Sequence, residues 1–132
     1  MPSYIRAVTF DCADPYTLAR FWAEVVGGEL GPENAPGGDE AWVVAADGRP
    51  ELLFLRVPEG KAVKNRVHLD LGPRGIRRED EKQRLVDLGA TVLKDFRRDN
   101  GGGFWLLADP EGNEFCVELS DEEIPEVYGR QP

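Results

Sequence analysis

Apolar and polar residues alternate near the C-terminal end of the chain in the pattern of a strand. Successive side chains of a strand point to opposite faces of a sheet. Over residues 114–119 one face would carry Phe115, Val117 and Leu119, and the other Glu114, Cys116 and Glu118. The preceding residues predict a tight turn, because Pro110 fixes φ at the second turn position and Gly112 or Asn113 can take a positive φ. One face of this strand is therefore expected in the core, and its polar face is a candidate for function.

A different period predicts an amphipathic helix near the N-terminus. Apolar residues recur there every three or four positions, at Leu18, Phe21, Trp22, Val25 and Val26. Asp14 is a favourable N-cap residue and Pro15 suits the first helical position. Gly27 and Gly28 predict the end of the helix.

The rest of the pattern predicts a duplicated unit. Strands are expected at 4–12, 29–30, 41–46, 51–57, 66–71, 90–95, 104–108 and 114–119, and a second, mostly charged helix at 75–88. Each half then runs strand, helix, strand, strand, strand. The spacing from Ala7 to Gly28 equals that from His68 to Gly89, and such self-similarity indicates repeated structural units.

The predicted fold class is α+β, in one domain over residues 1–132. Two tandem βαβββ modules, 4–58 and 66–119, would form a curved mixed sheet around a cup, with the helices outside. Asp47-Gly48 and Asp109-Pro110 are expected in matching turns. Residues 120–132 are expected to be an irregular acidic tail, with Ile124, Val127 and Tyr128 able to dock.

Composition narrows the classes of partner. The chain has 132 residues and a formal net charge of −9, so clustered cations for nucleic acid or an anionic membrane surface are not expected. No apolar run approaches the roughly 20 residues of a membrane span. Two cysteines far apart in sequence suggest no disulfide framework. The expected setting is the cytoplasm.

Three stretches resemble the glyoxalase-like branch of the vicinal oxygen chelate superfamily, which includes glyoxalases, bleomycin-resistance proteins and extradiol dioxygenases. They are 10–15 together with 18–22, then 67–71, and then 109–116. The resemblance spans residues 4–119 and implies the duplicated fold. It also implies a divalent metal held by one side chain from the first and last strand of each half.

Carried over one position at a time, the resemblance predicts an incomplete metal site. Ala7 and Leu55 stand at two of the four positions and cannot bind a metal. His68 matches, and Cys116 stands where most metal-binding members carry Glu. At most two donors remain, whereas a catalytic zinc site needs about three protein ligands. We therefore expect no metal and no cofactor.

His68, the only histidine, is the predicted catalytic residue, because imidazole titrates near neutral pH. Its alternative is a hydrogen-bonded histidine on the cup wall. The predicted ligand-binding residues are Asp11, Asp70, Trp105, Cys116 and Glu118. Each has a structural alternative: the carboxylates can lie in solvent at strand ends, the tryptophan in the core, and the cysteine as a small buried apolar residue or, alternatively, a nucleophile.

The predicted function is binding of a small molecule, without the complete metal site. One alternative is a metal-dependent lyase or dioxygenase that uses His68 and an atypical ligand set. Others are a non-catalytic antibiotic-sequestering protein and an interaction module with a filled cup. The carboxylates of Asp11, Asp70 and Glu118 would make the cup negative. This favours a cationic aromatic or heterocyclic ligand over an anionic one. A homodimer is expected, because the superfamily often pairs chains and exposed sheet edges need covering.

Overall fold

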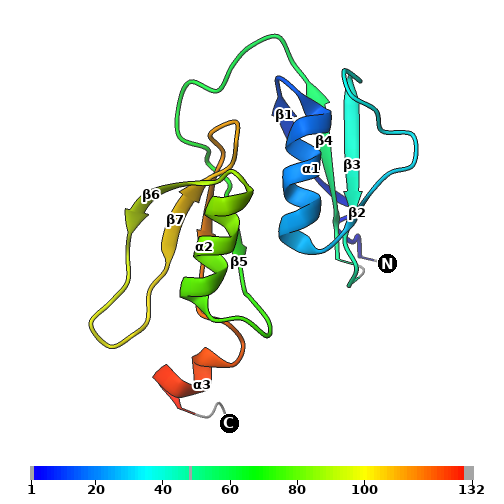
Figure 1. Ribbon diagram of the computed structural model, residues 1–132. Helices are drawn as coiled ribbons and strands as arrows, with labels where there is room; N and C mark the ends of the chain where they lie inside the picture. The colour runs from blue at the N-terminus through cyan, green and yellow to red at the C-terminus, as the bar shows by residue number, and fades with distance from the viewer. Residues whose placement is uncertain (1, 48, 130–132) are drawn as a thin grey trace. The chain divides into compact units, whose positions relative to one another are not determined.

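The computed structural model describes residues 2–47 and 49–129. The chain forms two compact units, residues 1–62 and 63–132 (Figure 1). The predicted turn at Asp47-Gly48 includes Gly48, which lies outside the described residues. Among the described residues, no helix is both long and apolar enough to cross a membrane.

The first unit is one helix on a four-stranded mixed sheet (Figure 1). Its elements are β1 (Ala7–Cys12), α1 (Pro15–Val26), β2 (Glu29–Leu30), β3 (Glu40–Val44) and β4 (Glu51–Arg56). The strand order is β1-β4-β3-β2. β1 and β4 are parallel, and the other neighbours are antiparallel.

Helix α1 begins and ends where the sequence predicts. The Asp14 side chain accepts a hydrogen bond from the Thr17 backbone N–H (3.3 Å), which satisfies one of the unpaired donors of the first turn. Gly27 ends the helix in the left-handed region, at φ 62°. The buried stripe includes Leu18 and Trp22, and the Trp22 ring lies 5.6 Å from that of Phe10 on β1.

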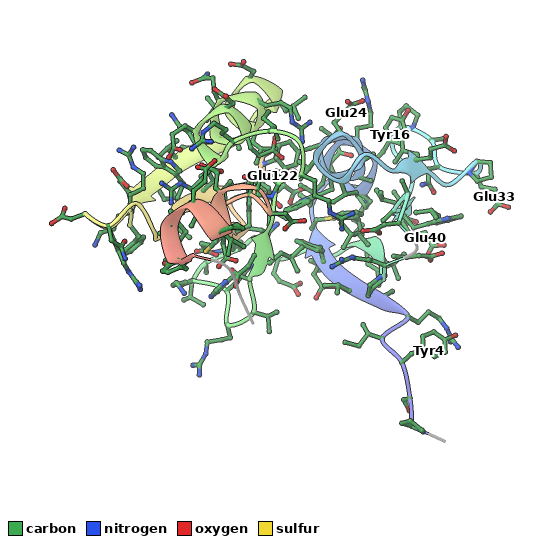
Figure 2. All side chains as sticks on the ribbon, turned by 90° about the horizontal axis from the view of Figure 1, so that it is seen from below. Tyr4, Tyr16, Glu24, Glu33, Glu40 and Glu122 are labelled. Carbon is green, nitrogen blue, oxygen red and sulfur yellow. The ribbon has the colours of Figure 1, made fainter. Side chains whose placement is uncertain are left out.

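The N-terminal strand is shorter than predicted. β1 begins at Ala7 rather than at residue 4. The preceding segment makes no ladder, and Tyr4 is 75% exposed and projects away from the sheet (Figure 2). Figure 2 also shows Tyr16 and Glu24 on the outer side of α1.

The second unit repeats this plan and adds a short helix (Figure 1). Its elements are β5 (Leu69–Leu71), α2 (Arg78–Leu88), β6 (Thr91–Asp95), β7 (Trp105–Ala108), β8 (Glu114–Val117) and α3 (Glu123–Tyr128). The strand order β5-β8-β7-β6 matches that of the first unit, with β5 and β8 parallel. The α+β class and the two βαβββ modules are therefore confirmed. The cup stays a prediction.

Helix α2 begins three residues later than predicted. Gly75 takes φ +72°, which no helical residue adopts, so the helix starts only at Arg78. Gly89 ends it, as expected. The helix packs on the sheet through a narrow face whose fully buried apolar residue is Leu85.

The prediction of an irregular tail is wrong, because residues 123–128 form α3. Ser120 and Glu123 make the reciprocal bonds of a capping box: the Glu123 N–H donates to Ser120 Oγ (3.1 Å) and the Ser120 N–H donates to Glu123 Oε1 (3.0 Å). The same Oε1 accepts the Arg78 N–H (2.7 Å). One buried carboxylate thus caps α3 and α2. Ser-x-x-Glu is visible in the sequence and is the signal that predicts this cap.

The remaining contacts of the tail hold it against the second unit. The Glu122 carboxylate, labelled in Figure 2, accepts the Gly75 N–H (2.9 Å). Tyr128 lies so close to Gly102 that a Cβ there would stand 2.2 Å from the phenol oxygen. The predicted docking of Tyr128 is therefore confirmed, at the turn before β7.

Candidate functional site

The sheet of the second unit has two chemically different faces. Leu107 and Phe115 are directly opposite each other on β7 and β8 and are fully buried, as is Leu85 of α2. The opposite face carries Asp70 and Cys116, which are partners on the parallel strands β5 and β8. The predicted alternation in residues 114–117 is thus correct, and the polar face of β8 is the face opposite α2.

His68, Asp70 and Cys116 come together on that polar face. His68 directly precedes β5 and lies 3.3 Å, Nδ1 to Oδ1, from Asp70. One ligand atom from each of the three residues lies within 4.8 Å of the others. The His68 and Asp70 side chains are 39% and 49% exposed, whereas Cys116 is 5% exposed. The cluster therefore has a buried thiol beneath two groups that a ligand can reach.

Hydrogen bonds around the turn before β8 fix two backbone segments, the one that leads into Cys116 and the one that leads into His68. Asp109 Oδ1 accepts hydrogen bonds from the N–H groups of Glu111 (2.9 Å) and Asn113 (3.0 Å), while Gly112 takes φ +89°. The Asn113 side-chain oxygen accepts a bond from the Asn65 amide (2.8 Å). The Asn65 N–H donates to Glu114 (3.1 Å). The turn thus fixes the start of β8 and the segment that leads into His68.

Carboxylates make the cluster electrostatically negative. The pKa of Cys116 is raised to about 11, first by burial and then by the charge of the nearby Asp70 carboxylate, with which the thiol forms a hydrogen bond. Lys64 opposes this shift. Burial and then Asp70 also raise the pKa of Glu118. Cys116 is therefore a protonated thiol at neutral pH, which argues against a nucleophile activated in the free protein.

Two of the predicted ligand-binding residues are not brought into this cluster. Trp105 is opposite Val117 and therefore lies on the α2 face. Its Nε1–H donates to Glu79 of α2 (3.3 Å), and Arg97 lies 4.4 Å from its ring centroid. The alternation along β7 thus turns Trp105 to the helix side, and its role in ligand binding stays a prediction. Asp11 lies in the first unit, exposed on β1, and its role in ligand binding stays a prediction.

A separate open groove of about 350 Å³ lies beside α2 and the tail. It is lined by Gly75, Ile76, Arg77, Asp80, Ser120 and Glu122. Its one cation among these, Arg77, pairs with Glu126 (3.1 Å) and with Glu123 (3.3 Å). The groove contains none of the clustered residues and brings together no comparable set of reactive groups.

The sequence matches a family model described as a glyoxalase-like domain over residues 7–118. The chain belongs to the glyoxalase-like domain family. A search of curated proteins found no significant match.

Solved structures of this glyoxalase-like fold resemble the chain over most of its length. One is a glyoxalase/bleomycin resistance protein/dioxygenase family enzyme from Burkholderia phytofirmans, with 17% identity, a TM-score of 0.65, and coverage of 87% of this chain and 97% of that one. The fosfomycin resistance protein FosX from Mesorhizobium loti has 15% identity, a TM-score of 0.67 and coverage of 89% and 92%. FosX from Listeria monocytogenes has 16%, 0.66, and coverage of 93% and 94%. At these identities the likeness shows the fold.

The metal positions implied by the superfamily resemblance are only partly filled in this glyoxalase-like chain. Ala7 lies on β1, and Leu55 is opposite Asp11 on β4. The neighbouring position on the same face of β4, opposite Thr9, is Leu53. Whichever of these two positions of β4 corresponds to the family's ligand, it holds a leucine. The first unit therefore offers no donor at these positions.

The second unit brings one further possible donor beside the two at the family positions. Asp70 lies with His68 and Cys116, and one ligand atom from each lies within 4.8 Å of the others. The sequence carried a signal for this: His68-x-Asp70 places both side chains on one face of a strand. Asp70 is at none of the family positions, so it was predicted as a ligand-binding residue and not as a metal ligand. The expectation that no metal is bound stays a prediction. The supporting role of Asn65 was missed, because it depends on a contact distant in sequence.

Proposed function

We propose that the protein binds a small molecule at the cluster of His68, Asp70, Cys116 and Glu118. The observation that supports this is the convergence of His68, Asp70 and Cys116 within 4.8 Å on the sheet face opposite α2. Buried or half-buried polar groups that converge in this way are typical of ligand sites. Asn65 and the Asp109 turn hold them in place without ligand.

His68 is the residue proposed to exchange a proton with the ligand. Its Nδ1 faces Asp70 at 3.3 Å, and such a carboxylate orients the ring and fixes which nitrogen carries hydrogen. Nε2 is then the nitrogen directed to a ligand. A ligand with an acidic O–H or N–H would donate to Nε2. Asp70 is a positioning residue, and His68 is the proposed catalytic residue if the bound molecule is turned over.

The charge of the cluster favours a cationic ligand. Asp70 lies close enough to Glu118 to raise its pKa, so two carboxylates act on the same space. Lys64 offsets this only in part. Listeria FosX is complexed with Mn(II) and a dihydroxypropylphosphonic acid. A phosphonate would be repelled by this cluster, so we propose a ligand with an amine or heterocyclic cation instead.

Calorimetry with a matched ligand set tests this proposal. Cationic, neutral and anionic analogues of one aromatic scaffold are titrated into wild-type protein with a chelator present. We expect the cationic member to bind best, and Asp70→Asn to weaken it about tenfold while leaving the neutral member nearly unchanged. Asp99→Asn makes the same charge change in the exposed turn before β7 and is the control.

Tighter binding of the anionic member would contradict the proposal, as would equal losses in Asp70→Asn and Asp99→Asn. Turnover of any bound analogue that disappears in His68→Gln, with binding retained, would identify an enzyme. Binding without turnover would identify a sequestering protein. A thermal-shift screen against metabolites and antibiotics supplies the starting scaffold, because a ligand that prefers the folded state raises its stability.

We also propose a cytoplasmic homodimer. The two cysteines remain thiols, which suits a reducing compartment. Strand β6 lies at the edge of its sheet, and all five of its residues are exposed. Val92 and Leu93 are among them, and an exposed apolar edge is a surface that a second chain can cover. Light scattering at micromolar concentration should give the mass of two chains, and a single-chain mass would contradict this.

A further inference from the structure

A row of four residues runs across the sheet of the second unit on the face opposite α2. Asp70 on β5 is opposite Cys116 on β8, and Cys116 is opposite Leu106 on β7. Lys94, on β6, is opposite Leu106 from the other side. Because β5 and β6 are the two edge strands of this sheet (Figure 1), the row has a carboxylate at one edge and an ammonium at the other. Its middle is a buried thiol and a half-buried leucine.

A bulge in β6 places Lys94 on this face. Val92 is opposite Leu107, a fully buried residue of the α2 face. Lys94, two residues further on, is opposite Leu106 on the other face. Regular alternation would keep residues two apart on the same face, and the register shift between Val92 and Lys94 changes this. Bulges re-aim side chains in this way and are frequent beside functional sites.

The surroundings of Lys94 orient its charge without neutralising it. Its Nζ lies 4.8 Å from the centroid of the Phe96 ring, and that ring stacks on Phe104 at 4.9 Å. The adjacent carboxylate, Asp95, has the opposite parity and pairs with Arg97 (2.8 Å). The row thus keeps a positive end beside two aromatic rings and a negative end beside His68.

We propose that the ligand of this face is a zwitterion, with its cation at Asp70 and an anion such as a carboxylate at Lys94. This inference rests on the proposed function, which supplies the cationic end, and it adds the second charge and the length of the molecule. The anion would lie three strands away from Asp70, so it avoids the repulsion that a purely anionic ligand meets at the cluster.

The sheet geometry sets the length of this ligand. Neighbouring strands are about 4.8 Å apart, so the two ends of the row are about 14 Å apart at the backbone. Each charged contact takes up about 3 Å, so the two charges of the ligand would lie roughly 8 to 14 Å apart. The part between them would lie over Leu106 and should therefore be apolar.

Calorimetry with matched amines tests the inference. The probes are 4-phenylbutylamine and its ring carboxylate, 4-(4-aminobutyl)benzoic acid, titrated with a chelator present. We expect the zwitterion to bind about three- to fivefold more tightly than the amine, which is the gain of one exposed ion pair. The shorter zwitterion 4-(aminomethyl)benzoic acid cannot reach both charges and should show no gain over benzylamine.

Variants of Lys94 assign the gain to this residue. Lys94→Gln should remove it and leave the affinity for 4-phenylbutylamine nearly unchanged, and Lys94→Glu should make the zwitterion the weaker ligand. Lys82→Gln is the matched control, because Lys82 Nζ also lies 4.8 Å from an aromatic ring centroid, that of Trp105 on the α2 face. This control should keep the gain, and Asp70→Asn should weaken both probes.

Equal affinities of 4-phenylbutylamine and its carboxylate for the wild-type protein would overturn the inference. A gain that survives Lys94→Gln, or that is lost equally in Lys82→Gln, would overturn it too. In these cases the preference for a cation at Asp70 stands. If neither probe binds, the proposed function and this inference fail together. Circular dichroism of each variant confirms that it is folded.

Discussion

At the scale of single residues, the chemistry of the candidate site depends on Asp70. It faces the imidazole of His68, meets the thiol of Cys116 and raises the pKa of Glu118. A substitution here changes three neighbours at once. A variant at Asp70 is therefore expected to change ligand binding and proton transfer together.

Cys116 should be unreactive toward alkylating agents at neutral pH. Its pKa is raised to about 11, and only the thiolate reacts with alkylating agents. In a Cys12→Ser background, the rate of iodoacetamide labelling should keep rising with pH until near that value. Asp70→Asn removes a nearby negative charge and should accelerate labelling at neutral pH. Full labelling of the folded protein within minutes at neutral pH would contradict this.

Glu118→Gln should stabilise the protein slightly at neutral pH. The folded-state pKa of Glu118 is raised from its ordinary value of 4.5, so its ionisation above that value opposes folding. The glutamine variant removes this cost, and the gain should disappear below the ordinary value, where the carboxyl is protonated in both states. Urea unfolding at several pH values measures it. Glu33→Gln, in an exposed loop of the first unit, is the control and should show no such pH-dependent gain.

At the scale of elements, caps and turns decided how well the sequence predicted the fold. Helix α1 was predicted to the residue because Asp14, Pro15 and Gly27 mark both ends. Helix α2 was predicted three residues too long because Gly75 adopts a turn conformation that composition alone does not show. Helix α3 was missed although Ser120 and Glu123 carry the capping-box pattern.

The candidate site was predictable to a similar degree. Alternation along 114–119 correctly placed Cys116 on a polar face, and the same rule puts His68 beside Asp70. The parity of β7, which turns Trp105 toward α2, also follows from alternation once the strand bounds are known. The contact of Asn65 with Asn113 joins residues 48 positions apart. No local pattern in one sequence encodes such a contact.

Glu123→Gln should destabilise the second unit, because the carboxylate caps two helices from a buried position. Burial alone would raise its pKa, but hydrogen bonds from Arg78 and Ser120 and the charge of Arg77 lower it overall. Loss of such a cap costs about 1 kcal/mol or more. Chemical denaturation measures this cost.

The effect of this variant should depend on pH with a defined sign. A lowered pKa contributes stability above the ordinary value of 4.5 that is lost as the pH falls through the folded-state value. The difference between wild type and Glu123→Gln should therefore shrink in acid. Glu126→Gln is the control, since Glu126 pairs with Arg77 in a more exposed position, and its cost should be smaller. Equal losses in both variants would contradict a double cap.

At the scale of the whole molecule, charge and duplication matter most. The net charge of −9 adds a long-range field to the local carboxylates. Affinity for a cationic ligand should therefore fall as the salt concentration rises, because mobile ions screen that field. Calorimetry at low and high sodium chloride checks this. The same titration with the neutral analogue should be insensitive to salt, and equal sensitivity of the two would indicate another cause.

The cap at Glu123 also bears on where an independently folding fragment can end. The family model matches residues 7–118, and a fragment cut at those bounds would lose the carboxylate that accepts a hydrogen bond from the first residue of α2. It would also lose the backbone bond from the Asp121 N–H to the Pro73 carbonyl. The segment most readily dismissed as a dispensable extension is thus part of the cooperative unit. We therefore expect a fragment that ends at residue 118 to be less stable than the full chain.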